Sequence, residues 1–213
     1  TMSISYDFPH YESEEDYYNV SRISTDNLDD ARALDLNGDG REDLIYQYKE
    51  SCFYYRLSGP NTLSAPVQVS IIPNNATAGL SGKKLRKYMW YAYDNEFIES
   101  DYNGDGIQDI FICDEPGNWE ILSFVNSSGQ LDTSFYTKAS GIDSNLSNDG
   151  DILSADFNGD GKTDIWSFQS TGLKIYSLVG QSMNLVYSDM TIDKYNFYVL
   201  GDFNGDGKAD ILV

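Results

Sequence analysis

The chain has 213 residues, of which 40% are hydrophobic and 14% aromatic, so it is long enough to bury a core. Asp and Glu total 34 against 14 Lys and Arg, which gives a formal net charge of −20. This acidic excess argues against a DNA or RNA partner and against a polybasic membrane anchor, because both kinds of binding rest on Lys and Arg side chains. Apolar runs of only a few residues predict no membrane insertion.

Short runs rich in β-branched and aromatic residues predict strands along the whole chain, and no long helical pattern is present. Within residues 1–25, two such runs occur at 3–8 and 19–23. The rest divides into four predicted repeats, at about 31–72, 96–138, 151–190 and 196–213. The first three each hold four predicted strands, whereas the fourth holds two before Val213. We therefore expect an all-β fold, with residues 1–213 forming one domain or part of one.

The segment from Pro73 to Asn95 makes the first repeat interval longer than the others. It carries four basic residues between Lys83 and Lys87 and then an aromatic run from Tyr88 to Tyr93. Insertions in repeat folds often form binding faces, so one interpretation is a loop for a protein or glycan partner. The other is that the aromatic side chains pack on a neighbouring strand while the basic side chains stay in solvent.

One motif of nine residues occurs four times, and its copies begin 66, 55 and 46 residues apart. Counting from its first residue, Asp occupies positions 1, 5 and 9, Asn position 3, and Gly positions 4 and 6 in every copy. Position 7 varies. The residues at positions 1, 3, 5, 7 and 9 are Asp35, Asn37, Asp39, Arg41 and Asp43; Asp101, Asn103, Asp105, Ile107 and Asp109; Asp156, Asn158, Asp160, Lys162 and Asp164; and Asp202, Asn204, Asp206, Lys208 and Asp210.

The chemistry of this motif is that of a calcium loop. Ca²⁺ takes six to eight oxygen ligands, and a short loop supplies them from alternate positions. The side chains at positions 1, 3, 5 and 9 offer carboxylate and amide oxygens, while the variable position 7 would offer its backbone carbonyl. Glycine at positions 4 and 6 permits the positive φ that such a tight curl requires. We expect up to four Ca²⁺ sites, whose ligands include 12 of the 34 acidic residues.

An EF-hand loop opens in the same way but requires an acidic residue at position 12 and a following helix. Position 12 is occupied here by Tyr46, Ile112, Ser167 and Val213, none of which is acidic. Runs with strand character follow position 9 in every copy, for example Ile110-Phe111-Ile112. The loops are therefore expected to join one strand to the next.

The repeated loop D-x-N-G-D-G-x-x-D-[IL] resembles the calcium loop of FG-GAP/VCBS repeats, which occur in integrin α-subunits and in many bacterial surface or secreted proteins. The resemblance spans about residues 31–213. It implies a β-propeller of four-stranded antiparallel blades, with the loop between the first and second strands of each blade. Two closures stay open: a fragment of a larger propeller, or a small ring completed by residues 1–25. No FG or GAP signature surrounds the loops, so integrin-type ligand recognition is not implied.

Three functions follow as hypotheses. The leading one is a non-catalytic, calcium-stabilised module for protein interaction or scaffolding in a secreted or cell-surface protein, although no signal peptide is visible in the chain. The second is a carbohydrate-binding, lectin-like propeller that uses some of the 17 Tyr and 3 Trp residues. The third is a polysaccharide lyase or hydrolase, for which His10 with Lys83 or Arg86 would be the available basic groups. No residue is assigned a catalytic role.

Two cysteines, Cys52 and Cys113, are too few for a disulfide scaffold. We expect them to be small buried side chains, with a bridge between them as the alternative. The single histidine, His10, excludes a His-based zinc site.

Overall fold

The computed structural model describes residues 31–48, 52–60, 63–69, 97–113, 117–126, 128–147 and 150–213. Within these ranges every regular element is a β-strand and none is a helix. The expected all-β fold is therefore confirmed for the described part of the chain. Among the same residues, no helix is present that could cross a membrane.

Three antiparallel sheets have four strands each, in the order of the sequence. The first holds β1 (Ala31–Leu34), β2 (Asp43–Tyr48), β3 (Cys52–Arg56) and β4 (Val67–Val69). The second holds β5 (Phe97–Ser100), β6 (Asp109–Cys113), β7 (Asn118–Val125) and β8 (Leu131–Ile142). The third holds β9 (Asp151–Ala155), β10 (Asp164–Gln169), β11 (Gly172–Val179) and β12 (Ser182–Asp189). The fourth sheet pairs only β13 (Val199–Gly201) with β14 (Asp210–Leu212).

One strand is longer than its residues indicate. Strand β8, the outer strand of the second sheet, extends over 12 residues from Leu131 to Ile142. It follows β7 for the whole of that strand, with register shifts that absorb the excess length. Polar residues such as Asp132 and Lys138 interrupt the apolar pattern of this edge strand, so its true ends are not visible in the sequence.

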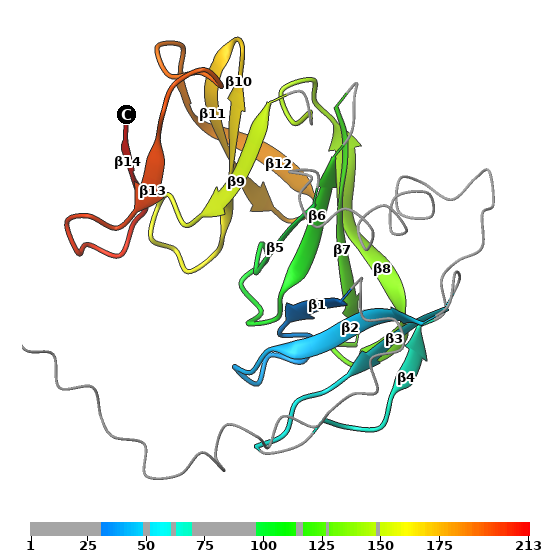
Figure 1. The fold of residues 1–213 in the computed structure, drawn as a ribbon. Helices are drawn as coiled ribbons and strands as arrows, with labels where there is room; N and C mark the ends of the chain where they lie inside the picture. Colours follow the sequence, from blue (N-terminus) through cyan, green and yellow to red (C-terminus); the bar gives the residue numbers. More distant parts are fainter. Residues whose placement is uncertain are drawn as a thin grey trace, which may run out of the picture.

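The sheets follow one another as a curved row in sequence order, with the first sheet and the β13–β14 sheet at its two ends (Figure 1). Successive sheets are joined by apolar clusters that lie between them. The cluster between the first two sheets comprises Leu34, Leu36, Ile45, Tyr55 and Val69 from one and Ile110, Ile112, Leu122 and Phe124 from the other. The described sheets thus pack face to face, as blades do, but no closed ring is formed.

Strand β6 shows how one strand serves two of these clusters. Side chains alternate between the two faces of a strand. Ile110 and Ile112 accordingly pack in the cluster with the first sheet, while Phe111 and Cys113 pack in the cluster with the third. All four side chains are buried. A strand buried on both faces reads as an uninterrupted apolar run, which is the pattern of residues 110–113.

The third and fourth sheets share a cluster built around Trp166, Phe168, Leu173 and Ile175 of the third sheet. The Tyr198 ring stacks on Phe168 with 3.8 Å between ring centroids, and the Tyr198 hydroxyl donates to the Asp151 carboxylate at 2.5 Å. The fourth sheet is therefore attached to the row by the same kind of apolar contact as the others.

Several expected features lie outside the described residues. They are the strands proposed within residues 1–25, the segment Pro73 to Asn95, and the basic groups His10, Lys83 and Arg86. Cys113 is a buried thiol in the cluster between the second and third sheets.

Candidate metal centre in the four repeated loops

Each repeated motif joins the first strand of a sheet to the second, as expected. The first loop covers residues 35–43, the second 101–109, the third 156–164 and the fourth 202–210. The position-9 aspartate of every loop is the first residue of the strand that follows. Positions 1 to 8 therefore form the connection between two neighbouring strands of the same sheet.

The glycines adopt the backbone conformation that the motif predicts. Gly38 at position 4 has φ of 72° and Gly40 at position 6 has φ of 78°. Both positions have positive φ in the other three loops as well. Side chains with a Cβ rarely adopt this region, so the expectation of a tight, glycine-dependent curl is confirmed.

The aspartate at position 1 organises the curl from within. In the first loop, Asp35 Oδ1 accepts a hydrogen bond from the amide of Gly38 at 2.8 Å, and Oδ2 accepts one from Gly40 at 2.7 Å. The same two bonds recur in the other loops at 2.6 to 2.9 Å. In the fourth loop such bonds, led by the one from Gly207, hold the pKa of Asp202 below its usual range.

Positions 3 and 5 turn their side-chain oxygens back onto the loop. Asn37 Oδ1 accepts the Asp39 amide at 3.0 Å, and Asp39 Oδ1 accepts the Arg41 amide at 3.0 Å. Equivalent bonds of 2.8 to 3.0 Å are present in the other three loops. These are Asx turns, in which a short polar side chain caps the backbone two residues on.

The aspartate at position 9 is buried in the first three loops. Asp43, Asp109 and Asp164 are each at most 1% exposed, and burial raises the pKa of all three. In the first and third loops this carboxylate accepts the amide of position 2, at 3.1 Å from Leu36 and 2.9 Å from Phe157. The other oxygen of each carboxylate accepts a second hydrogen bond, which comes from the amide of Ser58 for Asp43 and from the hydroxyl of Ser177 for Asp164.

Asp109 in the second loop differs from its equivalents. Its Oδ2 accepts the Asn103 side-chain amide at 2.9 Å, but its Oδ1 is buried and has no hydrogen-bond partner among the described residues. Burial raises the pKa of Asp109 to about 7; the nearby Ser123 hydroxyl opposes the shift but lies outside hydrogen-bonding geometry to Oδ1. A buried carboxylate oxygen without a partner is costly, and a bound cation is one way to satisfy it.

The carboxylates of one loop do not converge in this structure. Among the described residues, no group of three or more Asp, Glu, His or Cys side chains is close enough together to hold a metal ion. The position-1 carboxylates are occupied by backbone amides, and in the first loop Asp39 forms an ion pair with Arg41 at 2.7 Å. The structure thus brings every predicted ligand into its loop without assembling a coordination shell, and calcium binding stays a prediction.

A second role of the loops is not evident from their residues. The carbonyl of position 1 in each of the first three loops accepts the amide of position 8 in the next loop. The bonds run from Gln108 to Asp35 at 3.0 Å, from Thr163 to Asp101 at 2.8 Å, and from Ala209 to Asp156 at 2.7 Å. Because the donors are backbone groups, the side chains at position 8 give no signal of them.

Direct packing accompanies these hydrogen bonds. A Cβ placed on Gly38 would lie 3.1 Å from the Gly106 carbonyl oxygen of the second loop. A Cβ on Gly104 would lie 3.0 Å from the Lys162 side chain of the third loop, and one on Gly159 would lie 3.1 Å from the Lys208 side chain of the fourth. The position-4 glycines therefore serve two purposes: they permit positive φ, and they make room for position 7 of the next loop. The four loops form one continuous row.

Comparison with known proteins agrees with this architecture. A solved structure of a lectin from Agrocybe aegerita, described for specific recognition of non-reducing terminal N-acetylglucosamine, matches with a TM-score of 0.54 and 18% sequence identity. The match covers 84% of this chain and 44% of the lectin chain, so the chain spans less than half of that protein's length. No curated protein matches the chain.

The family model described as FG-GAP-like repeat matches residues 101–167 and 156–213, which together make up more than half of the sequence. These two segments contain the second, third and fourth loops and strands β6 to β14. The chain belongs to the FG-GAP-like repeat family.

Proposed function

We propose that this chain is a non-catalytic, calcium-stabilised, propeller-like module that serves protein interaction or scaffolding. The observation that carries this proposal is the orphaned Oδ1 of Asp109, which is buried in a loop rich in oxygen donors. Without a cation, the second loop leaves a carboxylate with a raised pKa and an unsatisfied oxygen. A bound cation would stabilise the ionised carboxylate of Asp109 and would give its Oδ1 a partner.

In each loop, side-chain oxygens at positions 1, 3, 5 and 9 would hold the ion, together with the carbonyl of position 7. Calcium suits this donor set because it prefers carboxylates and carbonyls and tolerates flexible geometry. The ion would supply positive charge at the centre of a strongly acidic loop. The loop's own contribution is the curl held by the position-1 aspartate, which places these donors on one short segment.

Stabilisation follows from preferential binding to the folded chain. A ligand present at 100 times its dissociation constant adds about 2.7 kcal/mol for each site that only the folded protein offers. Extracellular fluid contains millimolar calcium, which fills even sites of modest affinity. FG-GAP repeats are typical of extracellular or surface proteins, and we extend this localisation to the present chain.

The test is the melting temperature in millimolar calcium compared with the same protein in excess chelator. We expect a rise of several degrees with calcium, a smaller rise with magnesium, and up to four ions bound by isothermal titration calorimetry. The variant Asp105→Asn, which neutralises position 5 of the second loop, should bind fewer ions. An unchanged melting temperature with no heat of binding would overturn the calcium assignment.

A second candidate function is glycan binding, which is favoured by the fold shared with the Agrocybe aegerita lectin. An exposed aromatic platform is available in the third sheet, where Tyr187 packs against Phe157 with 5.5 Å between ring centroids. Aromatic faces of this kind stack on sugar rings. A glycan array that includes terminal N-acetylglucosamine tests this function, and loss of a signal in Tyr187→Ala would assign it to the platform. An array with no binding at all would remove the candidate.

A further inference from the structure

Four tripeptides of the form Asn-x-Ser/Thr occur in the chain, at Asn19, Asn75, Asn126 and Asn145. In proteins that pass through a secretory compartment, this tripeptide is the acceptor of N-linked glycans, which are attached at surface loops. Asn19 and Asn75 lie outside the described residues. The structure places the other two in different surroundings, and this difference separates them as acceptors.

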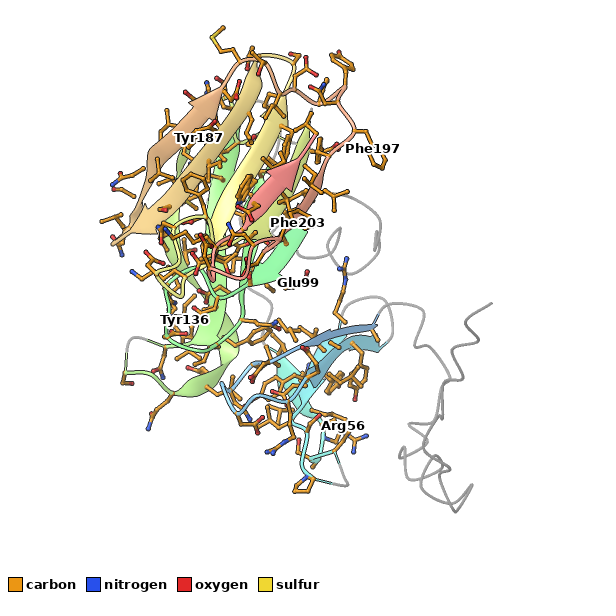
Figure 2. All side chains as sticks on the ribbon, turned by 90° about the vertical axis from the view of Figure 1, so that its left-hand side faces the viewer. Arg56, Glu99, Tyr136, Tyr187, Phe197 and Phe203 are labelled. Atoms are coloured by element: carbon orange, nitrogen blue, oxygen red, sulfur yellow. The ribbon has the colours of Figure 1, made fainter. Side chains whose placement is uncertain are left out.

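Asn126 directly follows β7 and begins the turn that leads into β8. Its side chain is partly exposed, and the other described residues of the turn, Ser128, Gly129 and Gln130, are exposed. Figure 2 labels Tyr136 on β8, the second strand of the same hairpin. The second sheet packs against a described sheet on each side. The exposure of this turn is therefore a property of the hairpin itself, since both neighbouring sheets are present.

The turn binds the Asn126 side chain through its oxygen. Oδ1 accepts the Ser128 amide at 3.0 Å, the Ser128 hydroxyl at 2.8 Å and the Gln130 amide at 3.1 Å. The Asn126 amide donates to the Gln130 carbonyl at 2.9 Å and closes the same turn. Among the described residues, Nδ2 of Asn126 has no hydrogen-bond partner. The nitrogen that a glycan would modify is thus available, and the hydroxyl of the acceptor tripeptide contacts the same side-chain amide.

Asn145 is built into the packing between the second and third sheets. Its Nδ2 donates to Asp143 Oδ1 at 2.7 Å, and the Tyr176 hydroxyl donates to the other oxygen of that carboxylate at 3.0 Å. The Asn145 carbonyl accepts the Ser167 hydroxyl of β10. The next residue, Leu146, is fully buried in the cluster between these two sheets. A sugar on Asn145 would break the bond to Asp143 and displace packed side chains.

We propose that Asn126 is an acceptor site for an N-linked glycan and that Asn145, which carries the same tripeptide, is not. The donor would be a sugar carried on a lipid diphosphate. Nδ2 of Asn126 would form a bond to the anomeric carbon of that sugar and release a proton, while the bond from this carbon to the diphosphate breaks and the diphosphate leaves with the electron pair.

The Ser128 hydroxyl has a role in this step. It donates to Oδ1 of Asn126, and the amide oxygen gains negative charge as Nδ2 loses its proton. A hydrogen bond to a charged acceptor is stronger than one to a neutral acceptor, so the hydroxyl would favour the reacting form of the amide. In the natural setting the proposal rests on the extracellular localisation proposed above, because the modifying enzymes act within the secretory pathway.

The test is the whole chain fused to a leader peptide and secreted from a eukaryotic host. Peptide N-glycosidase converts each modified asparagine to aspartate, and mass spectrometry of the peptides then reads the occupancy of each acceptor. We expect modification at Asn126 and none at Asn145 in the released chain. An unmodified Asn126, whether the chain is released or retained in the cell, would overturn the proposal. Modification of Asn145 in the released chain would overturn it equally.

Two variants of one residue separate the acceptor chemistry from the stability of the turn. Ser128→Ala removes the hydroxyl, retains the backbone bonds to Asn126 Oδ1, and should abolish the modification. Ser128→Thr is the matched control, because it retains a hydroxyl and should keep the modification. Undiminished modification of Ser128→Ala would contradict the proposed site.

The calcium assignment is tested separately on protein made in a host that does not attach glycans. There, neither Ser128 variant should alter the calcium-induced rise in melting temperature, because Ser128 lies outside the four repeated loops. The glycan is read from peptide masses and the ion from thermal unfolding. A failure of the calcium assignment is therefore distinguishable from a failure of the glycan site.

Discussion

The second and fourth loops share one motif but experience different surroundings. The second loop contacts a neighbouring loop on each side, and Asp109 at its position 9 is fully buried. In the fourth loop, Asp210 is partly exposed and Gly205 faces open space. The curl itself is the same, with equivalent hydrogen bonds from the position-1 aspartate. Local sequence therefore sets the loop's shape, while its neighbours set the energetic cost of its charges.

The largest contrast is expected from apolar truncation at position 11. Phe111→Ala should lower the free energy of unfolding by about 3–5 kcal/mol, since it removes a large buried side chain between two sheets. Leu212→Ala at the equivalent position should change it by no more than about 0.5 kcal/mol, because Leu212 is already 56% exposed. Chemical denaturation of both variants measures the difference. Equal losses would contradict the observed difference in burial between Phe111 and Leu212.

A second contrast concerns the glycines at position 4. Gly38→Ala and Gly205→Ala both force a Cβ into positive φ, at 72° and 78°, which costs about 1–2 kcal/mol in either loop. Gly38→Ala should cost more, because its Cβ would lie 3.1 Å from the backbone carbonyl of Gly106, whereas that of Gly205 meets nothing. Thermal unfolding in chelator measures both. A larger loss at Gly205 would refute the row of packed loops.

The third contrast is between the position-9 carboxylates in the absence of calcium. Asp109→Asn should leave the melting temperature in chelator unchanged or raise it by a few degrees, because it removes a buried charge with an unsatisfied oxygen. The same variant should lose part of the calcium-induced rise. Asp210→Asn, at a partly exposed site, should change little in chelator. A marked destabilisation of metal-free Asp109→Asn would show that the charge is satisfied in some other way.

The pH dependence provides a further test of Asp109. Its pKa in the folded chain is raised from 3.8 to about 7, so the folded state binds this proton more tightly than the unfolded state. Its contribution to stability is therefore complete below about pH 4 and is lost as pH rises through about 7. In chelator, the free energy of unfolding of the natural sequence relative to Asp109→Asn should fall across this window. A difference that is independent of pH would contradict the raised pKa.

The smallest effect is expected from the side-chain contacts that join neighbouring loops. Gln108→Ala removes a hydrogen bond of 2.8 Å from the Asp35 amide to Oε1, at a cost of about 0.5–1.5 kcal/mol. The backbone bond from Gln108 to the Asp35 carbonyl would remain. Lys208→Ala in the fourth loop is the matched control. It removes a side chain that lies against Gly159 of the third loop, whereas the backbone bond between these two loops runs from Ala209 to the Asp156 carbonyl and would remain. Urea denaturation measures both.

Much of the fold could be predicted from the repeated motif and the runs around it. The two glycines with positive φ and the strand that begins at position 9 are local features, and both were predicted from the residues. The hydrogen bonds from the glycine amides to the position-1 aspartate were not predicted, since that side chain was interpreted as a calcium ligand alone. The length of β8 was not, because polar residues obscure the ends of an edge strand. The hydrogen bonds from the amide of position 8 in one loop to the carbonyl of position 1 in the preceding loop could not be predicted either, because every residue carries these backbone groups.

The sequence by itself determined the class of fold, the position of every loop and the identity of the candidate calcium ligands, because short-range hydrogen bonding and conformational preference act within nine residues. Only the tertiary structure decided which equivalents of one motif position are core and which are surface. Phe111 and Leu212 are both apolar residues in the same place of the repeat, yet one is buried and the other exposed. The reason is that burial is a property of the neighbouring sheet, and the motif does not encode whether a neighbour is present.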